Sequence, residues 1–172
     1  DSIMVLHADA DGYNFYDETT LEPKPEIAYA IGLLEDCFDI NPNHPLCQHL
    51  YIHITEPSHK MAPISGPIAD NLLSTTAAGE AQHLQHMPSH TYLRIGRYHD
   101  AVMSNVIAHA SDHEYERHGA VAYAVAHDLV VLLCAANLNG EKKVALEYSD
   151  ILRDNYRNHP NRGDGPGTEV GW

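Results

Sequence analysis

Apolar residues recur every three or four positions through most of this chain, which is the period of an α-helix. The first clear run places one apolar stripe along a predicted helix: Ile27, Ala30, Ile31, Leu34 and Phe38. No stretch shows the strict alternation of apolar and polar residues that marks a half-buried strand. The pattern therefore predicts an all-α fold in which each helix buries one face.

Proline, glycine and asparagine divide this pattern into short helices, because these residues stop or turn a helix. The sequence predicts helices from Glu26 to the Asn41–Pro45 break, and at 46–55, 67–73, 80–95, 100–110, 119–137 and 141–155. Pro88 falls inside one of them and should kink it or begin a new first turn. Three regions result: a mixed or extended segment at 1–25, a helical-repeat domain at 26–157 and a Gly/Pro-rich extended tail at 158–172.

Two segments of the helical domain share one frame. Gly96 and Gly140 each stand at a turn between two helices, and an alanine follows five residues later, where the second helix would pack on the first. This frame resembles the tetratricopeptide repeat, a helix–turn–helix unit that stacks into a solenoid. The resemblance implies a short α-solenoid of antiparallel helix pairs. The residues expected to be buried between helices are Ala30, Leu34, Tyr98, Ala101 and Ala145.

The chain is strongly acidic. It carries 24 Asp and Glu residues against 10 Lys and Arg, a formal net charge of −14 with neutral histidine. This charge disfavours nucleic acid and anionic membrane as partners, and no apolar run is long enough to predict a membrane span. A hydrophobic content of 44% is typical of a globular protein. The charge suits a cationic ligand, a metal ion or solubility alone.

Three cysteines, Cys37, Cys47 and Cys134, form no C-x-x-C pair. An odd number with loose spacing favours free, mostly buried thiols, and a Cys37–Cys47 disulfide stays open for a secreted protein. The sequence begins at Asp1 and shows no signal peptide, so removal of a leader by processing also stays open. We expect a soluble protein and leave a secreted or periplasmic location open.

Histidine supplies the candidate chemistry. Two stretches place metal-capable side chains at helical spacing: His49-x-x-x-His53-x-x-Glu56 and His83-x-x-His86-x-x-x-His90. Residues three, four and seven apart lie on one helix face, so each stretch predicts a stripe of ligands. Neutral imidazole and carboxylate bind transition-metal ions such as Zn, Cu, Fe or Mn. One such histidine is more often a cap or a core residue, but two stripes in one small domain favour a metal site.

The string His86-Met87-Pro88-Ser89-His90 supports a closer resemblance. Together with the histidine string at 49–56, it is similar to a poorly characterised group of bacterial and algal tetratricopeptide-like proteins, over about residues 26–151. Members of this group usually carry His-Asn where this chain has His127-Asp128. They are usually longer, so this chain is expected to be a short member or a fragment. The group implies no established activity.

The repeat frame also predicts where the candidate ligands point. In tetratricopeptide arrays the first helix of each pair lines a concave groove. The candidates that fall at groove positions of this frame are His49, His53, Glu56, His83, His86, His90 and His127. The same spacing recurs at His109, His113 and Glu116, but on a second helix, where a solvated face is expected.

Three kinds of function fit these features. The first is a metal-binding helical-repeat protein, which would be a metalloenzyme if an open position on the ion activated water or O₂. Arg94 or Arg97 would then pair with Glu56 or with a substrate carboxylate. The second is an interaction module whose groove binds a peptide or protein partner. The third is a structural protein that self-associates into filaments through the apolar Ile3–Leu6 segment and the tail that ends at Trp172.

Overall fold

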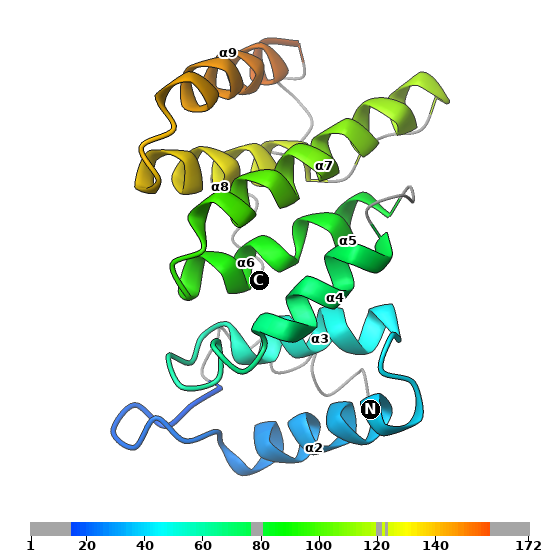
Figure 1. Ribbon diagram of the computed structural model, residues 1–172, viewed down its shortest axis with the longest axis vertical. Helices are drawn as coiled ribbons and strands as arrows, with labels where there is room; N and C mark the ends of the chain where they lie inside the picture. Colours follow the sequence, from blue (N-terminus) through cyan, green and yellow to red (C-terminus); the bar gives the residue numbers. More distant parts are fainter. Residues whose placement is uncertain (1–14, 77–80, 120–121, 123, 159–172) are drawn as a thin grey trace.

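A computed structural model describes residues 15–76, 81–119, 122 and 124–158. Its helices are α2 (Pro25–Ile40), α3 (Pro45–Thr55), α4 (Gly66–Thr76), α5 (Gln82–His86), α6 (Pro88–Arg94), α7 (Tyr98–Arg117), α8 (Val125–Leu138) and α9 (Lys142–Asn158). They follow one another in chain order along the long axis of the molecule, from α2 at one end to α9 at the other (Figure 1). The Ile3–Leu6 segment and residues 159–172 of the tail lie outside the described residues.

The all-α prediction is confirmed for these ranges. They contain no named strand, and the one isolated β-bridge joins Tyr16 to Pro23. No described helix combines the length and apolar character that a bilayer span requires. Residues 15–24 precede α2 and contain a turn at 18–20 between the two bridged residues, Tyr16 and Pro23.

Proline and glycine set most helix boundaries. Pro25, Pro45 and Pro88 occupy the first turn of α2, α3 and α6, where the missing N–H removes no helical hydrogen bond. Pro88 therefore begins a new helix, and Met87 before it keeps helical dihedral angles. Gly96 and Gly140 have φ values of 78° and 72°, so both predicted turns need a residue that tolerates the left-handed region.

Two predicted boundaries are wrong around Gly119. The helix expected at 100–110 continues to Arg117, and the helix expected from Gly119 begins only at Val125. Gly119 has φ 77° and ends α7 in a turn instead of opening α8. The apolar period alone did not reveal that this glycine separates the helices.

The main core lies where α3, α4, α6, α7 and α8 meet, and includes Ile52, Leu72, Tyr92 and Leu132. Of the residues expected between helices, Ala30, Leu34 and Ala101 are buried, whereas Tyr98 and Ala145 are half-buried. Ala145 packs on the main core from α9, the last described helix of the chain. A helix at the end of the molecule has fewer neighbours to cover it, and α9 lies at such an end (Figure 1).

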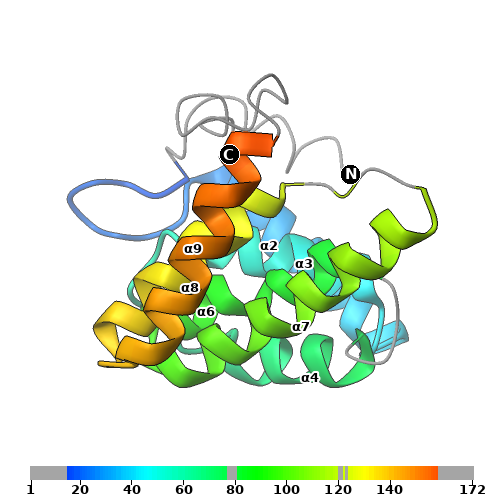
Figure 2. The ribbon, with the colours of Figure 1, turned by 90° about the horizontal axis from the view of Figure 1, so that it is seen from above.

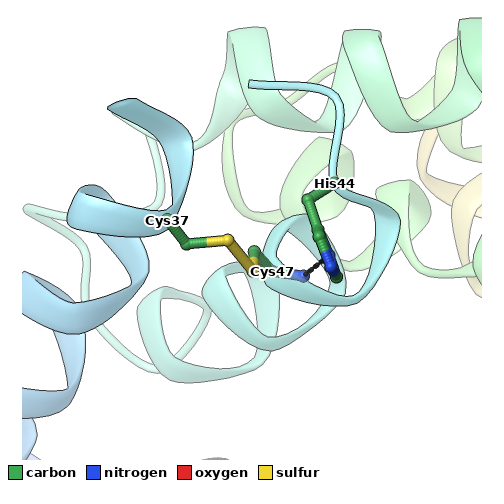
Figure 3. Close-up of side chains that lie close together, drawn as sticks. All are labelled: Cys37, His44 and Cys47. Carbon is green, nitrogen blue, oxygen red and sulfur yellow. Dashed lines mark hydrogen bonds between the residues drawn. A yellow bond between two sulfur atoms is a disulfide. The ribbon is translucent and has the colours of Figure 1, made fainter. Parts of the chain in front are cut away.

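A second core joins α2 to α3. It includes Ile27, Ala30 and Leu34 of α2. Nearby, a disulfide links Cys37 near the end of α2 to Cys47 at the start of α3 (Figure 3). His44 caps α3, since its Nδ1 accepts a hydrogen bond of 3.4 Å from the backbone N–H of Cys47.

The expectation of free, mostly buried thiols is therefore wrong. Cys37 and Cys47 are bonded, and the free Cys134 is exposed. The break at 41–44 folds the chain back, so the end of α2 meets the start of α3 and both cysteines come within bonding reach. A disulfide is compatible with an extracellular location.

Removal of this disulfide should destabilise the fold. The bond closes a segment of 10 residues, so Cys47→Ser is expected to lower the free energy of unfolding by about 2–3 kcal/mol through the added entropy of the unfolded chain. Urea denaturation followed by circular dichroism measures this change. Cys134→Ser, at an exposed free thiol, is the matched control and should leave the midpoint unchanged. Equal stability of Cys47→Ser and the parent chain would contradict the prediction.

Candidate metal centre

Histidines from four helices gather into one cluster, which we call the histidine cluster: His49 and His53 of α3, His83 and His86 of α5, His90 of α6 and His127 of α8. Neighbouring rings lie close, with centroids 4.7 Å apart for His49 and His53 and 4.9 Å apart for His86 and His127. The two stripes predicted from the sequence therefore meet, and His127 joins them.

The histidine cluster consists of two groups that can each hold a metal ion. In the group of His49, His53 and His83, and in the group of His86, His90 and His127, one nitrogen per ring lies within 4.8 Å of the others. The groups are adjacent, since the ring centroids of His83 and His86 are 6.0 Å apart. The arrangement thus offers two neighbouring three-imidazole sites.

The tautomer of His86 follows from its surroundings. Its Nδ1 lies 2.6 Å from Oδ1 of Asn105 and 3.1 Å from Oδ1 of Asp128. The Asn105 amide is fixed in this direction, because its Nδ2 donates a hydrogen bond of 2.9 Å to the Ala101 carbonyl. Both neighbours present oxygen acceptors, so Nδ1 of His86 must carry the proton. Its Nε2 then carries a lone pair.

The surroundings of His90 fix the same tautomer, with the proton on Nδ1. Its Nδ1 lies 3.1 Å from Oε1 of Glu56, and its Nε2 lies 2.9 Å from Nε2 of His86. Burial raises the pKa of Glu56, but the hydrogen bond from His90, the charge of Arg94 and, when they are protonated, the charges of His90 and His127 outweigh this effect and lower it overall. An ionised Glu56 accepts a hydrogen bond, so Nδ1 of His90 donates. In the neutral state, two Nε2 lone pairs therefore face each other.

Glu56, predicted as a ligand, lies beside the two groups as a partner of His90. It follows α3 directly and is half-buried. A carboxylate on the outer nitrogen of an imidazole orients the ring and increases its basicity, as is common around metal ligands. This geometry indicates that Glu56 positions His90.

Burial keeps most of the histidine cluster neutral. It lowers the pKa of His49, His83 and His127 to about 4 and that of His53 to about 2, with smaller contributions from neighbouring histidines. The pKa of His86, which is fully buried, falls well below its ordinary value for the same main reason. Neutral imidazole is the form that binds metal ions. The site therefore holds these five histidines in the competent form at neutral pH.

Three supporting residues were missed in the sequence. Asn105 and Asp128 contact His86, and Gln82 donates a hydrogen bond from Nε2 to Oδ2 of Asp128. All three are buried. Asp128 carried the clearest signal, because an acidic residue in the first turn of a strongly apolar helix is unusual inside a core.

The two arginines differ in their surroundings. Arg97 pairs with Asp70 at 2.9 Å and with Asp100 at 2.6 Å, and its guanidinium stacks 4.5 Å from the ring centroid of Tyr92. The guanidinium of Arg97 is therefore bound to Asp70 and Asp100 and does not serve Glu56. The charge of Arg94, in contrast, contributes to the lowered pKa of Glu56. Of the two predicted arginines, Arg94 is therefore the one whose charge reaches Glu56.

The expectation of a solvated face on α7 is wrong for part of that stretch. His109 and Asp112 are buried, whereas His113 and Glu116 are exposed. Burial is the main cause that lowers the pKa of His109 to about 4 and raises that of Asp112 to about 8. The sequence did not show that α9 would cover this side of α7.

Acid should destabilise the metal-free protein. Four of the cluster histidines have folded pKa values below the ordinary value of about 6.5: His49, His53, His83 and His127. Between these values the unfolded chain binds more protons, so the free energy of unfolding must fall as the pH drops from about 6.5 towards about 4. One pKa unit is worth about 1.4 kcal/mol, so several histidines together give a loss of a few kcal/mol.

Urea denaturation in the presence of a chelator, at pH 7 and pH 5, measures this loss. The double variant His49→Asn plus His53→Asn should reduce the difference between the two pH values. His99→Gln is the control, because the pKa of the exposed His99 is raised by its hydrogen bond to Glu141. Equal stability of the parent chain at both pH values would show that the buried histidines do not titrate as described.

Comparisons with known proteins add no identification. No protein-family model matches the chain, and neither a curated protein nor a solved structure matches it. The resemblance to the group with the His-Met-Pro-Ser-His string therefore stays a prediction, and any functional conclusion rests on the geometry of the histidine cluster.

Proposed function

We propose that this protein binds two transition-metal ions, one in each three-imidazole group of the histidine cluster. The facing Nε2 atoms of His86 and His90, 2.9 Å apart, carry this proposal. Both rings donate through Nδ1, so neither Nε2 of a neutral pair can donate to the other. Two lone pairs at this distance repel each other, and a cation bound by both nitrogens turns the repulsion into two favourable contacts.

The ligand set supports a first-row transition metal. Neutral imidazole suits Zn, Cu, Fe and Mn ions, whereas soft Cu(I) prefers sulfur ligands, which the histidine cluster lacks. Three protein ligands also leave a coordination position open to water or a substrate. The proposed centre thus has the form of a catalytic site, where bound water becomes a stronger acid or a substrate oxygen is polarised.

We also propose that the helices form tetratricopeptide-like pairs, with α3, α5–α6 and α8 as the first helices. All six cluster histidines come from these helices. Figure 1 supports this arrangement, since the helices lie in chain order along one axis. In such a stack the first helices line one concave side. The metal centre would then face a groove that a substrate can enter.

Metal analysis tests the proposed centre. After reconstitution with Zn, Cu, Fe or Mn and removal of free ions, we expect about two ions per chain in the histidine cluster, given three protein ligands per ion. His86→Ala plus His90→Ala should lose one ion relative to the parent, and His49→Ala plus His53→Ala should lose the other. Elemental analysis of the desalted proteins gives these numbers.

His99→Ala is the matched control for these variants. His99 is an exposed histidine that pairs with Glu141 at 2.8 Å, outside the histidine cluster. Its loss should leave the metal content unchanged. An absence of bound metal after reconstitution with all four ions would exclude the proposed function. A metal content that all three variants leave unchanged would place the ions elsewhere in the chain.

A further inference from the structure

A third group of potential metal ligands lies where α2 meets α3: Cys37, His44 and Cys47 (Figure 3). One ligand atom of each residue lies within 4.8 Å of the others. All three side chains are half-buried, so an ion or a small reductant can reach them. The junction is far from α9, since α2 forms the distant end of the molecule when it is seen from the α9 end (Figure 2).

This group is separate from the histidine cluster, although Cys47 and His49 are both on α3. Residues two positions apart on a helix do not face each other, so the two side chains serve different sides of α3. The chemistry also differs, because the histidine cluster offers ring nitrogens alone and this group offers two sulfurs. An ion bound here would therefore be recognised by its bonds to sulfur.

The imidazole of His44 presents a lone pair at this junction. Its Nδ1 accepts the hydrogen bond from the backbone N–H of Cys47, so the proton of the neutral ring lies on Nε2. The backbone of His44 is also held, because its N–H donates to the Asn41 carbonyl at 3.1 Å. The 3.4 Å bond to Nδ1 is long for a hydrogen bond, so its exchange for a bond to a metal ion costs little.

Contacts that do not involve sulfur hold the junction together. Gln48 of α3 donates a hydrogen bond of 2.8 Å from Nε2 to the Pro42 carbonyl. Asn71 of α4 donates one of 2.8 Å from Nδ2 to Oδ1 of Asn43. The second core also packs α2 on α3 through buried apolar side chains. These contacts persist when the disulfide is reduced, so the two thiols and the imidazole stay together, and a group placed in advance binds an ion at a low cost in entropy.

We infer that reduction of the Cys37–Cys47 disulfide turns this junction into a zinc site, in which the two thiolates and the imidazole of His44 bind the ion. Two cysteines and one histidine form a ligand set of zinc that leaves a fourth position for water or another ligand. Zn–S bonds of about 2.3 Å hold two sulfurs about 3.8 Å apart in a tetrahedral site. The ligand atoms of this group span no more than 4.8 Å, so a small separation of the sulfurs makes room for the ion.

The change between the two states balances in electrons and protons. A dithiol reductant gives two electrons and two protons to the disulfide, so the S–S bond breaks, two thiols form and the reductant becomes a disulfide. Zn²⁺ then replaces the two thiol protons, which pass to the solvent, and the oxidation state of zinc does not change. The end of α2 is thus linked to the start of α3 by a covalent bond in oxidising surroundings and by zinc in reducing ones.

Cobalt tests this site, because Co²⁺ bound by thiolate absorbs in the near ultraviolet and Co²⁺ bound by imidazole alone does not. We would use the full chain with Cys134→Ser, which leaves Cys37 and Cys47 as its thiols after reduction. A phosphine takes up the two electrons and, with water, becomes the phosphine oxide without adding a thiol. We expect the absorption to appear in the reduced protein alone, to saturate at one ion per chain and to disappear when Zn²⁺ replaces Co²⁺.

Variants of this chain identify the ligands. Cys47→Ser should abolish the absorption of the tight complex. His44→Asn removes the imidazole and keeps a side chain that caps a helix, so the fold should survive while Co²⁺ affinity falls by about tenfold or more. His59→Asn is the matched control, because His59 is exposed and belongs to none of the metal-ligand groups of the described residues. It should leave the affinity unchanged.

Three results would overturn the inference. The first is an absence of thiolate–cobalt absorption in the reduced protein at saturating Co²⁺. The second is unchanged affinity in His44→Asn, which would reduce the site to a pair of thiolates. The third is loss of the helical circular dichroism signal on reduction before any metal is added, because the ligands would then not be held in place. None of these results bears on the histidine cluster, which has no sulfur ligand.

Discussion

The arrangement of imidazole rings in the centre of this protein depends on which ring nitrogen carries the proton. Asn105 and Asp128 on one side, and Glu56 on the other, direct the Nδ1 protons of His86 and His90 outward. The remaining nitrogens then point at each other across 2.9 Å. A core of apolar side chains would avoid this arrangement, which is costly without a cation. The buried polar groups therefore fix the direction of the ring nitrogens in this part of the core.

Several helices supply the buried rings and the residues that orient them. The ring nitrogens come from α3, α5, α6 and α8, and the residues that orient them come from α7 and α8. Each helix also contributes apolar residues to the main core, so the ring positions are fixed by ordinary packing. Ligands that are held rigidly before the ion binds favour tight binding, because their side chains lose little conformational entropy on binding.

The sequence predicted the helices and the ligand stripes well, because both depend on spacing within one helix. His49 and His53 lie one turn apart on α3, and Met87 keeps helical dihedral angles between α5 and α6, so His86 and His90 also stay one turn apart. It did not predict partners that come from other helices. Asn105 lies 19 positions from His86, and only the packing of α5 on α7 brings them together. The burial of His109 and Asp112 likewise depends on α9, whose position no local pattern defines. The start of α8 was missed because Gly119 was assigned to the wrong helix.

The break at Met87–Pro88 has a further consequence. α5 has 5 residues and α6 has 7, and helices this short are not stable by themselves in water. His86 ends the first and His90 lies in the first turn of the second. An ion bound by both histidines would link α5 to α6 across the break and stabilise both helices. The helical order of α5 and α6 would then depend on bound metal, and protein without metal would be less ordered between α4 and α7.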